Sequence, residues 1–166
     1  MVGIPLFILS GYVLIIYQDL HRHGIVVLLY HQVIENEKEW SNKYQHRVSD
    51  FIQQLDYLSQ QGYETVIPSE INRLAEISND EKIIILTFDD GTPDHHEIVY
   101  PLLMQRKMKG VFFVIAGNLD KRYGLSASQL MEMSQNGMEI GSHSYSHPFL
   151  DEMTGEEIFY ELDKSK

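Results

Sequence analysis

Ile83-Ile84-Ile85-Leu86-Thr87-Phe88 is an unbroken run of buried-type residues, and Asp89-Asp90-Gly91 follows it directly. An apolar run of this length that ends in turn residues is typical of a strand buried in a parallel sheet. Further along the chain comes Gly141-Ser142-His143-Ser144-Tyr145-Ser146-His147-Pro148. Two adjacent carboxylates after one strand and two imidazoles after another are ligands for a single metal ion. The sequence therefore predicts a metal-dependent hydrolase.

Composition sets limits on this chemistry. The chain has 166 residues, of which 43% are hydrophobic and 22% charged, as expected for one globular domain. Its net charge of −11 disfavours binding to nucleic acid, because phosphate backbones would be repelled. The chain has no cysteine, so any metal must be held by histidine and carboxylate side chains.

The N-terminal segment differs from the rest of the chain. No charged side chain occurs between Val2 and Tyr17, and most residues there are apolar. We interpret residues 1–20 as an uncleaved signal-anchor that holds the chain in a membrane. The alternatives are a buried first helix or strand of the domain and a cleaved signal peptide. Arg22 alone does not determine the orientation in the membrane.

Strand and helix patterns alternate after this segment, which indicates a parallel α/β architecture. The expected strands have apolar runs, and the expected helices begin at capping or turn residues. The strands are expected at 25–30, 63–67, 83–88, 111–115 and 138–140, and the helices after Ser49, after Pro68, around 97–107, after Ser126 and after Thr154.

Polar residues follow three of these strands. His31 follows the first strand, Asp89 and Asp90 follow the central strand, and His143 and His147 follow the last strand. In parallel folds the carboxyl ends of the strands form one rim where ligands bind. We therefore expect these five side chains to share a site.

Each of these features also has an ordinary structural explanation. Asp-Asp-Gly is a common turn, two histidines four residues apart are a weak signal alone, and His31 is compatible with a structural histidine. Asp94 is expected to steady the loop after Gly91. The remaining histidines are interpreted as surface residues: His21, His23, His46, His95 and His96.

Taken together, the motifs resemble a known family. Thr87-Phe88-Asp89-Asp90-Gly91 and His143-Ser144-Tyr145-Ser146-His147 resemble the first two motifs of the polysaccharide deacetylases, also called NodB-homology or carbohydrate esterase family 4 enzymes. Lys109 to Val114 and Gly137 to Ser142 resemble the segments around those motifs. Tyr30-His31-Gln32-Val33 is similar to the start of the domain in the subgroup that acts on poly-N-acetylglucosamine. The resemblance covers residues 25–166.

The resemblance implies a site and a reaction. Asp90, His143 and His147 would bind one divalent ion, with Zn²⁺ favoured and Co²⁺, Mn²⁺ or Ni²⁺ acceptable. Asp89 would be the general base and His31 the general acid. The substrate would be an extracellular polysaccharide that contains N-acetylglucosamine, and the products acetate and a free amine. The domain would then lie outside the cytoplasm.

The resemblance also implies an incomplete or distorted (β/α) barrel, and the later motifs of the family are missing after Lys166. Residues 25–166 are therefore expected to form a deacetylase domain that is incomplete at its C-terminus. Two other functions remain open. One is an inactive relative that binds metal or glycan only, and the other is a different metal hydrolase such as a phosphoesterase.

Overall fold

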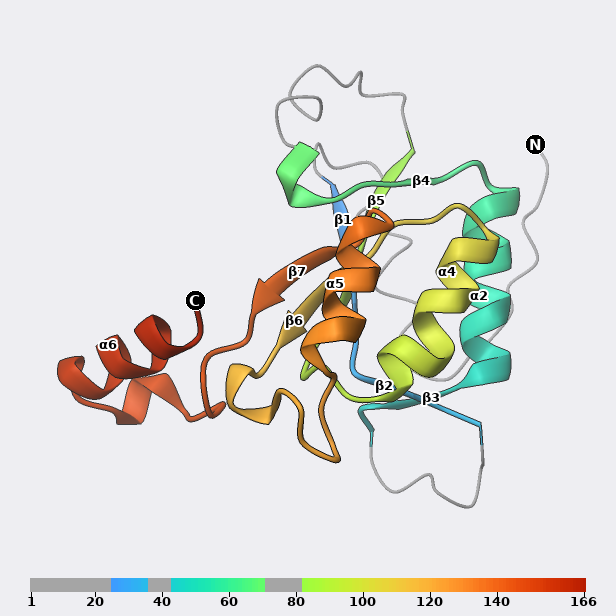
Figure 1. Cartoon of the computed structure of the whole chain (residues 1–166). Coiled ribbons are helices and arrows are strands. Elements are labelled where there is room, and N and C mark those ends of the chain that lie inside the picture. Colours follow the sequence, from blue (N-terminus) through green and yellow to red (C-terminus); the bar gives the residue numbers. More distant parts are fainter. Residues whose placement is uncertain (1–24, 36–42, 71–81) are drawn as a thin grey trace.

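The computed structural model describes residues 25–35, 43–70 and 82–166 (Figure 1). The predicted membrane segment 1–20 and the part of the expected helix that includes Ile71, Leu74 and Ala75 lie outside these residues. In the part that is described, no helix combines the length and the apolar character needed to cross a membrane.

Five strands form one sheet, and every pairing in it is parallel, as the sequence predicted. The main order is β1-β5-β6-β7, and β4 pairs with the first half of β5 while β6 pairs with its second half. A separate parallel pair joins two short strands. The sheet consists of β1 (Val26–Tyr30), β4 (Glu64–Thr65), β5 (Ile83–Phe88), β6 (Val111–Val114) and β7 (Glu139–Ser142). The separate pair consists of β2 (Gln32–Ile34) and β3 (Gln45–Arg47).

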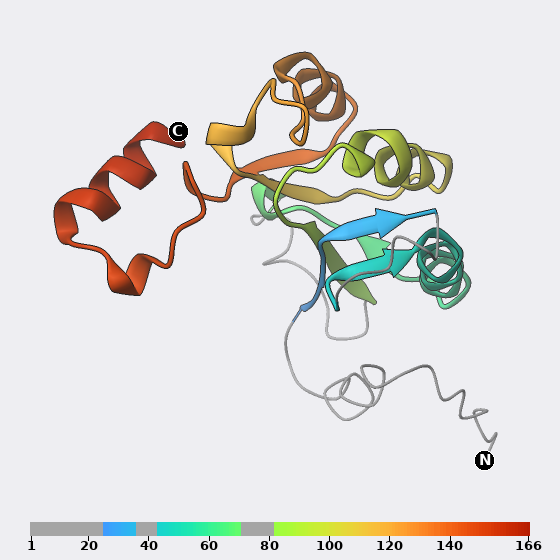
Figure 2. The same ribbon diagram turned by 90° about the horizontal axis from the view of Figure 1, so that it is seen from below.

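Three α-helices pack beside the sheet, and a fourth stands apart from it (Figures 1 and 2). The packed helices are α2 (Val48–Gln60), α4 (Tyr100–Gln105), which continues a π-helix η3 (His95–Val99), and α5 (Ala127–Gln135). The separate helix is α6 (Gly155–Lys164), at the red end of the chain in both views. Three single 3-10 turns complete the described elements: η2 (Pro68–Glu70), η4 (Ala116–Asn118) and η5 (Leu150–Glu152).

Aromatic rings form the core directly beneath the carboxyl ends of the strands. Tyr30, Phe88 and Phe112 are neighbours in the sheet register, and their rings stack with centroids 5.3 and 4.8 Å apart. Phe88 and Phe112 are fully buried, which stabilises the fold by about 1.5–3 kcal/mol for each ring. His31 follows Tyr30 and Asp89 follows Phe88, so both lie directly above this closely packed aromatic layer.

Two helix starts confirm the capping signals. The Ser126 side chain accepts a hydrogen bond from the backbone of Gln129, and the Gln129 side chain bonds back to the backbone of Ser126. Thr154 and Glu157 form the same reciprocal pair at the start of α6. These interactions span three residues, which is why sequence alone predicted them.

Other boundaries differ from the prediction. Helix α2 begins after Arg47, which makes no side-chain cap, so the prediction that Ser49 caps this helix was wrong. Strand β7 continues to Ser142 because Val114 of β6 pairs with Ser142, two residues beyond the predicted end at Ile140. The π-helix η3 also places the helical segment two residues earlier than the predicted start at 97.

The first strand is buried on one face only. Tyr30 is 4% exposed, whereas Val27 and Leu29 are 54% and 55% exposed. The apolar run of the first strand is thus buried only in part, because the face that carries Val27 and Leu29 is uncovered among the described residues. Strand β1 is also the edge strand on this side of the sheet, since β5 is its one strand partner among the described residues.

Candidate metal site

The turn after β5 carries both carboxylates of the site. Asp90 and Gly91 both have left-handed backbones, with φ angles of 79° and 68°. Aspartate tolerates this conformation and glycine favours it. A Cβ on Gly91 would lie 2.7 Å from Cγ1 of Val114, so only glycine allows the turn to pack this closely on β6.

The loop after β7 carries both histidines. The backbone N–H of His143 donates to the carbonyl oxygen of Val114 at 2.9 Å and so extends the pairing of β7 with β6. The hydroxyl of Ser144 accepts a hydrogen bond from the N–H of His147 at 3.0 Å. Ser144 and His147 have φ angles of 62° and 59°, which turn the loop back so that the rings of His143 and His147 lie 4.5 Å apart.

Three predicted ligands come together at this edge of the sheet. Oδ1 of Asp90 lies 3.6 Å from Nε2 of His143 and 4.0 Å from Nε2 of His147. Each of the three residues offers a ligand atom within 4.8 Å of the other two. Ligand atoms about 2.1 Å from a tetrahedral zinc ion lie about 3.4 Å from one another, so small side-chain movements suffice to coordinate an ion. The donor set of one carboxylate and two imidazoles suits zinc.

Asp89 lies beside this cluster. Its Oδ2 is 3.9 Å from Nε2 of His143, and its side chain is 15% exposed. Burial raises the pKa of the Asp89 carboxyl, and the charge of Asp90 adds to this, while His143 and His31 act in the opposite direction. A raised pKa makes a carboxylate a better proton acceptor at neutral pH.

His31 lies at the same rim, as predicted. It directly follows β1, and its ring packs against Tyr44 with centroids 4.9 Å apart. The backbone N–H of Asp89 donates to the carbonyl oxygen of Tyr30 at 3.0 Å, so His31 follows a residue that is bonded to the turn with both carboxylates. The structure thus brings the five predicted side chains to one edge of the sheet.

Sequence reasoning missed the role of His95. It was expected at the surface, but its side chain is fully buried and packs against the rings of Phe88 and Phe112, with centroids 5.8 and 5.7 Å away. Burial lowers the pKa of His95, so the ring is neutral at neutral pH. Its Nε2 lies 2.6 Å from the carbonyl oxygen of His31. Because a carbonyl oxygen can only accept a hydrogen bond, Nε2 is the donor. No sequence signal other than its closeness to Asp89 and Asp90 pointed to this contact.

Asp94, the residue before His95, also contacts the segment that contains His31. Its Oδ2 accepts a hydrogen bond from the N–H of Val33 at 2.7 Å. This contact gives Asp94 a structural role toward β2, whereas its predicted role in the loop after Gly91 stays a prediction. Asp94 and His95 together tie the turn after β5 to the segment that carries His31.

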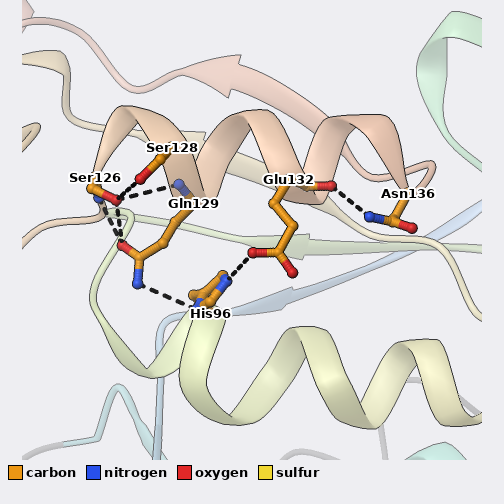
Figure 3. A network of polar contacts seen from close by, with 6 residues as sticks. All are labelled: His96, Ser126, Ser128, Gln129, Glu132 and Asn136. Carbon is orange, nitrogen blue, oxygen red and sulfur yellow. Dashed lines mark hydrogen bonds and ion pairs between the residues drawn. The ribbon is translucent and has the colours of Figure 1, made fainter.

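Two more histidines expected at the surface are partly buried. His46 packs edge-on against Tyr30. His96 joins η3 to α5: its Nε2 lies 3.0 Å from Oε2 of Glu132, and its Nδ1 lies 3.2 Å from Nε2 of Gln129 (Figure 3). This network fixes the helical segment that follows the two carboxylates.

Comparison with known proteins identifies relatives of this fold and site. The family model for polysaccharide deacetylases matches residues 76–166, which include both motifs. The Bacillus subtilis protein YxkH is 29% identical over 142 residues, which are 84% of this chain and 49% of YxkH.

Two solved structures are similar over most of the chain. The Streptococcus pyogenes deacetylase PplD, in complex with acetate, matches with a TM-score of 0.77 and 29% identity, over 86% of this chain and 66% of PplD. IcaB from Ammonifex degensii matches with a TM-score of 0.72 and 30% identity, over the same shares. The chain thus spans about half the length of YxkH and 66% of either solved structure.

Proposed function

The chain belongs to the polysaccharide deacetylase family, and on this premise we propose that it hydrolyses N-acetyl groups of a polysaccharide containing N-acetylglucosamine. The observation that carries this proposal is the cluster of Asp90, His143 and His147 at the carboxyl ends of β5 and β7. The acetate in the PplD complex supports it, because acetate is the expected product.

Asp90, His143 and His147 would hold one divalent ion, most suitably Zn²⁺, although Co²⁺, Mn²⁺ or Ni²⁺ would also fit these ligands. Such an ion supplies Lewis-acid chemistry, which polarises the acetamide carbonyl and acidifies a water molecule. Asp89, which is not one of the three ligands, accepts the proton of the attacking water. Its raised pKa suits that task.

The departing nitrogen needs a proton before the carbon–nitrogen bond breaks. His31, which follows β1 at the same rim, would give this proton to the nitrogen. The water oxygen ends in acetate, and the sugar keeps a free amine. Asp94 and His95 orient His31 through the backbone contacts described above.

The test is acetate release from N-acetylglucosamine oligomers by the purified chain. We expect a chelator to abolish release, added Zn²⁺ to restore it, and Asp90→Asn to remain inactive with zinc present. Asparagine keeps the left-handed backbone of Asp90 at little cost but weakens the ligand. Asp151→Asn, an exposed site in η5, is the matched control and should behave as wild type. Release that survives both the chelator and Asp90→Asn would refute the proposal.

A second function is favoured by the uncovered face of β1. Val27 and Leu29 are exposed among the described residues, so this face of the sheet lacks the covering layer that a closed (β/α) barrel would supply. In that case the chain would bind metal or glycan without turnover. Turnover that Asp89→Asn abolishes excludes this second function.

We further propose that residues 1–20 anchor the chain in a membrane, with the domain of residues 25–166 outside the cytoplasm. The support is the absence of charge from Val2 to Tyr17 and the expected polysaccharide substrate. Deleting residues 1–20 should move the protein from the membrane fraction to the soluble fraction. Retention in the membrane fraction after the deletion would contradict the proposal.

A further inference from the structure

Helix α6 buries one carboxylate. Glu161 is 4% exposed, while its neighbours Tyr160 and Leu162 are 51% and 48% exposed. The helix otherwise stands away from the packed helices (Figure 2). Burying a carboxylate is unfavourable unless hydrogen bonds satisfy its oxygens, so this position needs a structural reason.

Three hydrogen bonds supply that reason. Oε2 of Glu161 accepts the backbone N–H of Tyr145 at 3.0 Å and that of Ser146 at 2.7 Å. Oε1 accepts the hydroxyl of Ser146 at 2.7 Å. Tyr145 and Ser146 lie in the short loop between His143 and His147. The carboxylate therefore binds the loop that carries both imidazole ligands, through residues that are not themselves ligands.

This loop needs external support. Ser144 and His147 both have left-handed backbones, which are unfavourable for residues other than glycine. Such conformations persist when surrounding contacts over-determine them. On the side of β6, the backbone N–H groups of Ala116 and Gly117 donate to the carbonyl oxygens of Ser144 and Tyr145 at 3.1 and 2.8 Å. Glu161 binds the N–H groups of the same loop, so η4 and α6 together fix its backbone.

We propose that Glu161 is a positioning residue, which sets the spacing of His143 and His147 and thereby the metal affinity of the site. The inference rests on the proposed metal site but names a determinant outside its ligands. Sequence reasoning gave Glu161 no role, because its partners lie 15 and 16 residues earlier in the chain and on another element.

The test is zinc affinity, measured by competition with a chelating dye. Glu161→Gln keeps the size of the side chain but removes its charge, which weakens its bonds to the two N–H groups, and its amide nitrogen can no longer accept the hydroxyl hydrogen of Ser146. We expect an affinity loss of about 10–100-fold, the usual effect of losing a partner outside the ligand shell. Glu156→Gln removes the same charge from an exposed position on α6 and should leave the affinity within about twofold of wild type.

A second variant keeps the inference testable if Glu161→Gln fails to fold. Ser146→Ala removes only the hydroxyl contact, so its affinity loss should be smaller but measurable. In the double variant the two losses should be less than additive, because both act through one contact. Additive losses would indicate a long-range charge effect and would overturn the inference.

Amide hydrogen exchange provides a readout without metal. Exchange at Tyr145 and Ser146 should accelerate in metal-free Glu161→Gln and stay unchanged in Glu156→Gln. If wild type binds zinc and Glu161→Gln binds it equally well, the positioning role fails and the proposed function stands. If wild type binds no zinc, the proposed metal site and this inference both fail.

Discussion

The backbone N–H of Gly117 donates a 2.8 Å hydrogen bond to the carbonyl oxygen of Tyr145, and a Cβ on Gly117 would lie 2.5 Å from that same oxygen. Tyr145 lies between His143 and His147. The loop that carries these two ligands can therefore keep this conformation only if residue 117 is a glycine. The contact joins the segment after β6 to the loop after β7.

Gly117→Ala should displace this loop. We expect zinc affinity to fall by at least about 10-fold and the free energy of unfolding to fall by about 1–3 kcal/mol. Dye competition and urea denaturation measure the two effects. Gly155→Ala is the matched control, because a Cβ there meets no atom within 4 Å. Zinc affinity as strong as that of wild type in Gly117→Ala would show that the loop tolerates the displacement.

His31→Gln should slow the hydrolysis of amides more than that of esters. An amine leaves poorly without a proton, so the loss on N-acetylglucosamine oligomers should be about 10²–10⁴-fold. A phenolate leaves without protonation, so the rate on an aryl acetate should change far less. Asp89→Asn should slow both reactions, because both need the attacking water to lose a proton. Equal losses on the two substrates in His31→Gln would exclude His31 as the acid.

Asp94→Ala should destabilise the segment that carries His31. The change leaves the N–H of Val33, a fully buried residue, without its side-chain acceptor. We expect a loss of about 1–3 kcal/mol in the free energy of unfolding, measured by urea denaturation. Asp94→Asn keeps an acceptor oxygen and should lose less. A loss in Asp94→Asn as large as in Asp94→Ala would point to the charge rather than the hydrogen bond.

The Glu161 contact should make stability depend on pH in the acid range. The hydroxyl of Ser146, and then the N–H groups of Ser146 and Tyr145, hold the pKa of the Glu161 carboxyl below its ordinary value of 4.5. A lowered carboxyl pKa stabilises the folded state above the ordinary value, and this stabilisation is lost as the pH falls through the folded-state pKa.

Metal-free wild type should therefore lose thermal stability below pH 4.5 more steeply than Glu161→Gln. Melting temperatures across this range measure the difference, and Glu156→Gln should follow wild type. Parallel curves for wild type and Glu161→Gln would mean that the carboxylate contributes nothing to acid stability.

Local patterns in the sequence predicted the parts of the fold that depend on near neighbours. Strand β5 has the predicted bounds, because an unbroken apolar run ends at Asp89. The caps at Ser126 and Thr154 were confirmed for the same reason, since each cap bonds a residue three positions later. The end of β7 was wrong by two residues because its pairing with β6, rather than its own composition, extends it.

The sequence by itself determined the residue types of the site and the edge of the sheet where they meet, because parallel strands bring their carboxyl ends together. Only the tertiary structure decided how those residues are held. His95 contacts His31 across 64 positions and Glu161 contacts Tyr145 across 16, and no local pattern encodes such pairings. Burial in the folded chain makes both contacts matter, because a buried imidazole or carboxylate needs a hydrogen-bond partner that an exposed one finds in water.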